Sequence, residues 1–275
     1  MPRKSRSRRQ RLGQHFLTRR GAVERVVAAI APLPGQRFLE VGPGRGALTF
    51  PLLSAGARVV ALELDRSLAE GLTRRMAGEA RLSVVVGDIL DADLGSLVQS
   101  PLLAGPGVRV AGNLPYSVSS PAILRLLQAA DLFADFTLMV QREVADRILA
   151  SEGSRIFGVM TLLCAARATC RRLLDLSPSC FTPPPAVHST LLHFTPRPSP
   201  FLTPSEADGF ERVVKAAFSA RRKMLRNTLA LGLKMEVELA EAAARESGLN
   251  PEDRPERIPL QGYLELTRHL KGRIL

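Results

Sequence analysis

Between residues 36 and 140, short apolar runs alternate with segments of helix length. The apolar runs are RFLEV (37–41), ARVVALEL (57–64), RLSVVVGDI (81–89), VRVAGN (108–113) and FTLMV (136–140). They are rich in Val, Leu and Ile and do not alternate with polar residues, which is typical of parallel strands buried on both faces. The pattern predicts an α/β fold with a doubly wound, mostly parallel sheet.

Later segments complete this sheet and then change character. TLLCAARATCRRLLDL (161–176) and AVHSTLLHF (186–194) are expected to supply a further helix and the last strands. The prolines of TPRPSPFLTPS (195–205) continue neither a helix nor a strand, so they mark a domain boundary. We therefore predict a larger domain over 1–198, including a basic N-terminal arm, and a small helical domain over 199–275.

The charge of the chain indicates a polyanionic partner. A formal net charge of +12 and a pI near 10.8 suit either nucleic acid or an anionic membrane surface. The sequence has no run of eighteen apolar residues, so we expect no membrane span.

Cys164, Cys170 and Cys180 have neither zinc spacing nor the even count of a disulfide framework. We expect reduced thiols, no metal and a cytoplasmic protein.

Three consecutive strand ends carry ligand-binding residue types. The turn EVGPGRG places Gly42, Gly44 and Gly46 between a buried strand and a helix, with GxGxG rather than dinucleotide GxGxxG spacing. Glu63 ends the next strand, where it could accept hydrogen bonds from both ribose hydroxyls of an adenosine. Asp88 ends the third and could accept from an adenine amino group. This constellation is typical of Rossmann-like enzymes that use S-adenosylmethionine.

The fourth strand ends in NLPY (113–116), which suits methylation of an exocyclic amine. Such an amine is a poor nucleophile, so acceptors must hold its N–H bonds and aim its lone pair. The side-chain oxygen of Asn113 and the carbonyl of Leu114 can do this, and Pro115 fixes the turn. Tyr116 offers a face on which an extruded base can stack. The alternative is a plain strand-to-helix turn with a serine cap, and both roles are compatible.

These motifs together resemble the ribosomal RNA adenine N6-dimethyltransferase family. The resemblance runs almost end to end through GQHFL (13–17), EVGPGRGALT (40–49), LELD (62–65), GDIL (87–90), NLPY (113–116), CFTPPPAVHSTLLHF (180–194) and FSARRKMLRN (218–227). It implies that His15 and Leu17 contact S-adenosylmethionine and that Phe181 supplies an aromatic ring opposite Tyr116. GPGRGALT and NLPY are more similar to the small-subunit enzymes than to macrolide-resistance methyltransferases.

For the substrate, the resemblance implies dimethylation of two adjacent adenosines in the 3′-terminal hairpin loop of 16S rRNA during small-subunit maturation. We expect a monomer that acts on the RNA of an immature small ribosomal subunit. Two alternatives stay open: an adenine-N6 methyltransferase of another RNA such as 23S rRNA, and an assembly factor that acts mainly by binding pre-30S particles.

Two basic clusters are candidates for RNA contact. The N-terminal arm contains Arg3, Lys4, Arg6, Arg8, Arg9 and Arg11, and a second cluster contains Arg221, Arg222, Lys223 and Arg226. Charge runs are often only solvated surface, but the overall charge favours phosphate contact at the second cluster. Such contacts position RNA without specifying its sequence.

Overall fold

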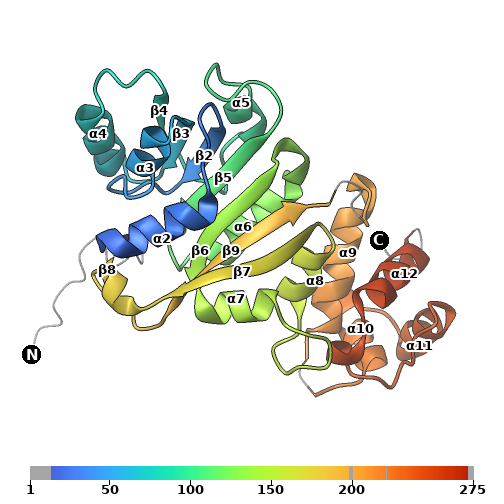
Figure 1. Ribbon diagram of the computed structural model, residues 1–275. Helices are drawn as coiled ribbons and strands as arrows, with labels where there is room; N and C mark the ends of the chain where they lie inside the picture. Colours follow the sequence, from blue (N-terminus) through green and yellow to red (C-terminus); the bar gives the residue numbers. More distant parts are fainter. Residues whose placement is uncertain (1–13, 198–200, 221, 272–275) are drawn as a thin grey trace, which may run out of the picture. The chain divides into compact units, whose positions relative to one another are not determined.

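A seven-stranded sheet forms the framework of the chain in this computed structural model, which describes residues 14–197, 201–220 and 222–271 (Figure 1). Its strands are β2 (Arg37–Val41), β3 (Arg58–Glu63), β4 (Leu82–Val86), β5 (Val108–Asn113), β6 (Asp135–Gln141), β7 (Ala168–Leu176) and β9 (Ser189–Pro196). Their order is β4-β3-β2-β5-β6-β9-β7. The predicted Rossmann-like sheet is confirmed.

Strand register brings the predicted site residues to one edge of the sheet. β2 runs parallel to both β3 and β5, and β6 runs parallel to β5. β3 also runs parallel to β4, with Glu63 opposite Val86, while Asn113 lies opposite Met139 of β6. β9 is antiparallel to β6, so its first residue, Ser189, lies beside the end of β6 opposite Gln141. The carboxyl ends of β2, β3, β4 and β5 therefore lie at the same edge.

A helix follows each of the strands β2 to β6. These helices are α3 (Thr49–Ser54), α4 (Arg66–Arg75), α5 (Leu94–Val98), α6 (Ser119–Gln128) and α7 (Arg142–Ile148), with a short 3-10 turn at Ala130–Leu132. α4 begins where the Asp65 carboxylate accepts hydrogen bonds from the backbone N–H groups of Ser67 and Leu68. α6 buries Ala122, Ile123 and Leu126, the spacing of a core-facing helix.

A helix and a small sheet near the N-terminus were not among the predicted elements. α2 (Arg20–Ile30) buries Ala22, Val26 and Ile30 at four-residue spacing. β1 (Phe16–Leu17) pairs antiparallel with β8 (Phe181–Thr182), which follows a 3-10 turn at Pro178–Cys180. This pairing joins two segments more than 160 residues apart in the sequence, and it brings the N-terminal segment close to the carboxyl edge of the sheet.

The C-terminal region is helical, as expected. It contains α9 (Pro204–Ala217), α10 (Leu225–Leu233), α11 (Val237–Glu246) and α12 (Leu260–Leu270), with a 3-10 turn at Pro255–Arg257. Glu206 accepts a hydrogen bond from the backbone N–H of Thr203, which fixes the start of α9. Tyr263 of α12 is fully buried, and its hydroxyl donates to the carbonyl of Pro255 at 2.8 Å.

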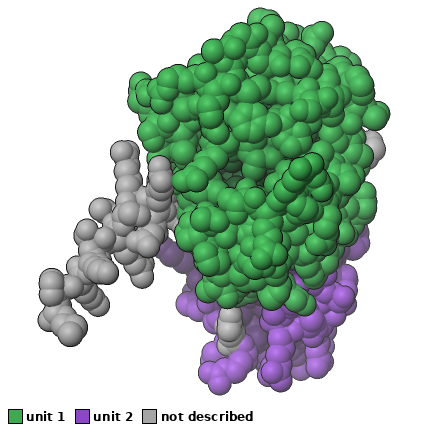
Figure 2. All heavy atoms as spheres, turned by 60° about the vertical axis from the view of Figure 1, so that its left-hand side comes forward, with its two compact units in different colours: residues 1–145, 170–196 green, residues 146–169, 197–275 purple. Residues whose placement is uncertain are grey.

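The chain divides into two compact units, drawn in different colours in Figure 2. Unit 1 consists of residues 1–145 and 170–196, and unit 2 consists of 146–169 and 197–275. Unit 2 thus includes α8 (Val159–Ala165), which lies before the proline-rich segment in sequence. A single cut between residues 198 and 199 stays a prediction. None of the helices found in the described part of the chain is both long and apolar enough to span a membrane.

Candidate functional site

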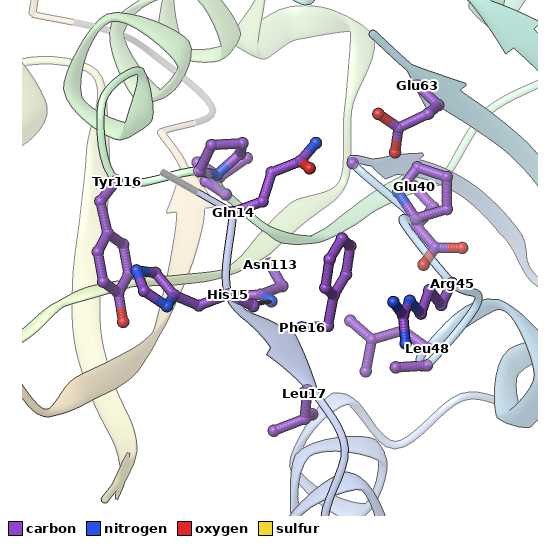
Figure 3. Close-up of a pocket in the computed structure, with 15 residues that line it drawn as sticks. Gln14, His15, Phe16, Leu17, Glu40, Arg45, Leu48, Glu63, Asn113 and Tyr116 are labelled. Atoms are coloured by element: carbon purple, nitrogen blue, oxygen red, sulfur yellow. Dashed lines mark hydrogen bonds between the residues drawn. The ribbon is translucent and has the colours of Figure 1, made fainter. Parts of the chain in front are cut away.

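A pocket in unit 1 lies at the carboxyl edge of the sheet (Figure 3). Three segments line it: residues 14–17, the turn after β2, and the turn after β5. Glu63 from the end of β3 completes the lining. In Figure 3, Glu40 and Glu63 lie on one side of the pocket and Tyr116 on the other, with residues 14–17 passing between them. Of the predicted residues, it brings together His15, Leu17, Gly42, Glu63, Asn113, Leu114, Pro115 and Tyr116.

The glycine turn has the backbone geometry that the sequence predicts. Gly42, Gly44 and Gly46 have φ values of +67°, +56° and +85°, which side-chain-bearing residues rarely adopt. A Cβ on Gly44 would lie 2.9 Å from the ring of Phe16. Arg45 places its guanidinium 5.0 Å from the centre of the same ring. Phe16 therefore packs directly against the turn, a contact that the sequence did not indicate.

Glu63 is a buried carboxylate held by backbone donors. Its Oε2 accepts from the N–H of Gly44 and its Oε1 from the N–H of Asp65, both at 2.9 Å. Burial raises the pKa of Glu63, and the two backbone hydrogen bonds oppose that rise. Each oxygen has a second lone pair, so the carboxylate can also accept from two ligand hydroxyls. Its proposed ribose contact is compatible with this geometry.

Glu40 is a site residue that sequence reasoning missed. It lies within the otherwise apolar β2, is 1% exposed and lines the pocket. Burial raises its pKa to about 7, and the nearby Glu63 carboxylate contributes in the same direction. Its Oε2 has no hydrogen-bond partner within the described structure. A carboxylate inside an apolar strand was the signal available in the sequence, since such a residue is rarely buried without a partner.

Asp88 lies in an adjoining pocket of the same edge. That pocket shares Gln14, Gly42, Glu63 and Pro115 with the first, so the two form neighbouring parts of one site. Asp88 Oδ1 accepts from the backbone N–H of Leu90 at 3.0 Å, which fixes its side chain at the end of β4. Ile89 adds a buried apolar wall. A carboxylate beside an apolar wall suits a base with an exocyclic amino group.

Asn113 is oriented by the N-terminal segment. Its Nδ2 donates to the backbone carbonyl of His15 at 2.9 Å. The side-chain oxygen Oδ1 is therefore the amide atom left to accept from a ligand. Leu114 is anchored by its own N–H, which donates to the carbonyl of Met139, and Pro115 accepts from Val118 to close the turn. The roles predicted for the first three residues of NLPY are compatible with this arrangement and stay predictions.

Tyr116 is half-buried and held from two directions. Its hydroxyl is hydrogen-bonded to Ser189 Oγ at 2.7 Å, and burial raises its pKa. The His15 ring lies 5.1 Å from the Tyr116 ring with an interplanar angle of 33°. His15 Nδ1 in turn donates to the carbonyl of Pro183 at 2.8 Å. His15 is thus linked to Asn113 through its backbone and to Tyr116 through its side chain.

The structure places Phe181 in the core rather than in the pocket lining. Phe181 is 3% exposed and belongs to the apolar core of unit 1, and it is absent from the pocket lining. Strand alternation explains this placement, because pairing with Leu17 turns Phe181 inward and leaves Thr182 exposed. Gly44 and Gly46 also lie outside the lining, and a Cβ on Gly46 would collide with Phe50. Stacking by Phe181 and cofactor contact by Gly44 and Gly46 stay predictions.

The predicted RNA cluster separates into different environments. Arg226 Nη1 lies 3.2 Å from Glu241 and 3.3 Å from Glu252, so its charge is neutralised inside unit 2. Lys223 is exposed, and Arg222 lines a cleft of unit 2 together with Arg147, Arg155 and Arg254. Arg221 and the basic arm at residues 3–11 lie outside the described residues. Ion pairing makes Arg226 a poor candidate for phosphate contact.

The hydrogen-bond acceptors of the pocket fit S-adenosylmethionine. Glu63 and Asp88 provide acceptors for the hydroxyl and amino groups of an adenosine, and the unpartnered oxygen of Glu40 is a buried acceptor suited to an ammonium group. When bound, this cofactor supplies an electrophilic methyl group on a sulfonium. Nowhere in the described ranges does a group of three histidine, cysteine or carboxylate residues form a metal-binding cluster.

The sheet and this site together define an S-adenosylmethionine-dependent methyltransferase. The sequence profile of the family described as ribosomal RNA adenine dimethylase matches residues 5–271. The chain belongs to that family.

A curated relative agrees with this assignment, and two solved structures share the fold. The "Ribosomal RNA small subunit methyltransferase A" of Pseudomonas aeruginosa is 39% identical over 263 residues, which are 95% of this chain and 94% of that protein. A dimethyladenosine transferase from Plasmodium falciparum has a similar fold, with a TM-score of 0.76, 23% identity and coverage of 94% of this chain and 98% of that one. The 23S rRNA methyltransferase ErmE has a TM-score of 0.64 at 23% identity, covering 93% and 99% of the two chains.

Proposed function

We propose that this enzyme transfers methyl groups from S-adenosylmethionine to the N6 amino groups of two adjacent adenosines in the 3′-terminal hairpin loop of 16S rRNA. The RNA target is supported by the small-subunit methyltransferase that is 39% identical over nearly the whole chain. Action on immature small subunits, in the cytoplasm and as a monomer, is part of this proposal.

The observation that carries the chemistry is the orientation of the Asn113 amide. Because Nδ2 donates to the carbonyl of His15, Oδ1 is available to accept a hydrogen from the adenine amine. The backbone carbonyl of Leu114, on the same turn, is the second acceptor. Holding both N–H bonds draws the nitrogen toward a pyramidal geometry and aims its lone pair. This positioning is expected to supply most of the rate acceleration.

Tyr116 is the platform on which the extruded base stacks. A base must leave its RNA stack to reach a pocket, and stacking on an aromatic ring compensates part of that cost. The half-buried ring of Tyr116 is kept next to Asn113 by the short turn that joins them. The amine becomes acidic only after methylation, so the proton can leave without a strong base beside the nitrogen. No further residue is required for the transfer step.

Parallel substrates test the target. Purified protein with methyl-labelled cofactor is offered naked 16S rRNA, 30S particles lacking the modification and 23S rRNA. Label in two adjacent adenosines of the 16S hairpin is expected, and label in 23S rRNA alone would refute the proposed substrate. The Asn113→Ala variant serves as the matched inactive control.

The same variant separates catalysis from an assembly role. If Asn113→Ala protein restores 30S maturation as well as the wild type does in cells lacking the enzyme, binding is the main contribution to assembly. If maturation fails while the variant still binds pre-30S particles, methyl transfer is required. Either result is read together with the labelling experiment, which reports the activity directly.

A further inference from the structure

Ser189 is a buried residue whose hydroxyl contacts Tyr116, and the proposed mechanism does not yet use it. It is fully buried and is the first residue of β9. Its Oγ lies 2.7 Å from the hydroxyl oxygen of Tyr116, across 73 residues of sequence. Ser189 is absent from the pocket lining, so it does not itself face a ligand there. Any effect of Ser189 on the reaction must therefore act through Tyr116.

The two partners of this hydrogen bond differ in rigidity. Tyr116 lies on the turn between β5 and α6, where a bond of 3.3 Å from Ser119 Oγ to the Tyr116 carbonyl helps to hold the backbone. Ser189 is part of the sheet, because β9 pairs with β6 along six consecutive residue pairs. Groups in a hydrogen-bonded sheet are more precisely placed than groups on loops. The bond therefore holds the hydroxyl of Tyr116 at a fixed position relative to the sheet.

A stacking platform needs this rigidity. The Tyr116 side chain is partly exposed, and the His15 ring contacts it at a tilt of 33° rather than in a parallel stack. Packing alone thus leaves the side chain able to swing about its Cα–Cβ bond. Fixing the hydroxyl at the far end of the ring prevents that swing, because the hydroxyl oxygen lies on the ring axis and moves whenever the axis changes direction. The base then meets a ring face that is already in place, and its amine stays aligned with Asn113.

We infer that Ser189 is a positioning residue for methyl transfer, which it promotes by fixing the position of the Tyr116 ring for the stacked base. This inference rests on the proposed function, because it assumes that an adenine stacks on Tyr116. It predicts that loss of the Ser189 hydroxyl loosens one aromatic ring without changing the cofactor site.

The composition of the chain gives a direct probe of that ring. The protein has no tryptophan and only two tyrosines, Tyr116 and Tyr263. Tyr263 belongs to the core of unit 2. In a Tyr263→Phe variant Tyr116 is the one remaining tyrosine, so it dominates the ultraviolet fluorescence of the protein. In this background, time-resolved tyrosine anisotropy reports the mobility of Tyr116 alone. The expected result is a larger fast-depolarising fraction after Ser189→Ala.

Kinetics measured on the same proteins test the functional part. Single-turnover methyl transfer at saturating RNA and cofactor is expected to fall roughly 10-fold in Ser189→Ala, since misalignment of a reacting group costs rate rather than cofactor affinity. Cofactor affinity by calorimetry should be unchanged. Tyr116→Phe removes the same hydrogen bond, so the double variant should be no slower than the slower of the two single variants.

Thr190→Ala is the matched control on the same strand. Thr190 is also fully buried, and its hydroxyl donates to Asp175 at 2.6 Å rather than to Tyr116. This control should lower thermal stability while leaving the anisotropy and the transfer rate unchanged. If Ser189→Ala behaves like Thr190→Ala, or if the effects of Ser189→Ala and Tyr116→Phe add, Ser189 is only a structural residue. A wild-type protein inactive on 16S rRNA would instead count against the proposed function, and the anisotropy result would still stand.

Discussion

Glu40 makes the stability of unit 1 depend on pH in a direction that can be worked out from its surroundings. The residue is 1% exposed, and burial raises its pKa from 4.5 to about 7. The folded chain therefore holds the Glu40 proton more tightly than the unfolded chain does. The resulting stabilisation is fully present below pH 4.5 and is lost as the pH rises toward 7. Glu40→Gln removes this titration while keeping the size of the side chain.

The two pKa values set the magnitude. Each pH unit between them contributes about 1.4 kcal/mol, so the full effect from 4.5 to about 7 is about 3.4 kcal/mol. At pH 5 the unfolded chain is already mostly ionised, and about 2.5 kcal/mol of the effect remains to be lost by pH 8. Wild-type protein should lose this amount between pH 5 and pH 8 beyond any loss seen in Glu40→Gln. The contributions of other titrating groups to the pH dependence are the same in both proteins and cancel in the comparison. Glu63 is the exception, because its charge interacts with that of Glu40.

Urea unfolding without added cofactor measures the difference. Tyrosine fluorescence in the Tyr263→Phe background follows Tyr116 and therefore unit 1, which avoids mixing in the unfolding of unit 2. Any constant cost of burying the glutamine amide appears equally at both pH values and drops out. Parallel pH dependences for wild type and Glu40→Gln would refute the reasoning, because Glu40 would then ionise alike in both states.

The remaining predictions concern ligand binding and rate. Glu63→Ala should weaken cofactor binding by about 1 to 3 kcal/mol in calorimetry and also lower the melting temperature, because two backbone N–H groups lose their acceptor; unchanged cofactor affinity would remove Glu63 from the site. Asn113→Ala should slow single-turnover transfer by roughly 100-fold with cofactor affinity retained, whereas near wild-type rates would make the amide only structural. Replacing Arg221, Arg222 and Lys223 by Ala should reduce the slope of log RNA affinity against log salt by about 2, and an unreduced slope would make the cluster solvated surface.

Local patterns in the sequence predicted the residues at strand ends. A parallel sheet places consecutive carboxyl ends at one edge, so Glu63, Asp88 and Asn113 could be assigned to one site from order alone. The glycine turn was also predictable, because its residue type is dictated by local backbone angles. These inferences need no knowledge of distant contacts. They hold because the geometry of a parallel sheet is nearly the same in every protein that contains one.

Residues that depend on distant pairing could not be found in this way. Phe16 packs on Gly44 only because β1 pairs with β8, and neither two-residue strand is long enough to show a pattern. The same pairing directs Phe181 into the core, while the resemblance had placed its ring opposite Tyr116. Arg226 looked like part of a basic cluster, yet Glu241 and Glu252 reach it from other parts of unit 2.

His15 shows what these long-range contacts add to the site. Its backbone carbonyl accepts from Asn113 and its ring contacts Tyr116, while its Nδ1 donates to Pro183. The acceptor for the amine and the platform for the base are thus both tied to one residue of the N-terminal segment. Because that segment also lines the cofactor pocket, a cofactor that orders it would order Asn113 and Tyr116 as well. Cofactor binding should therefore precede productive binding of the base.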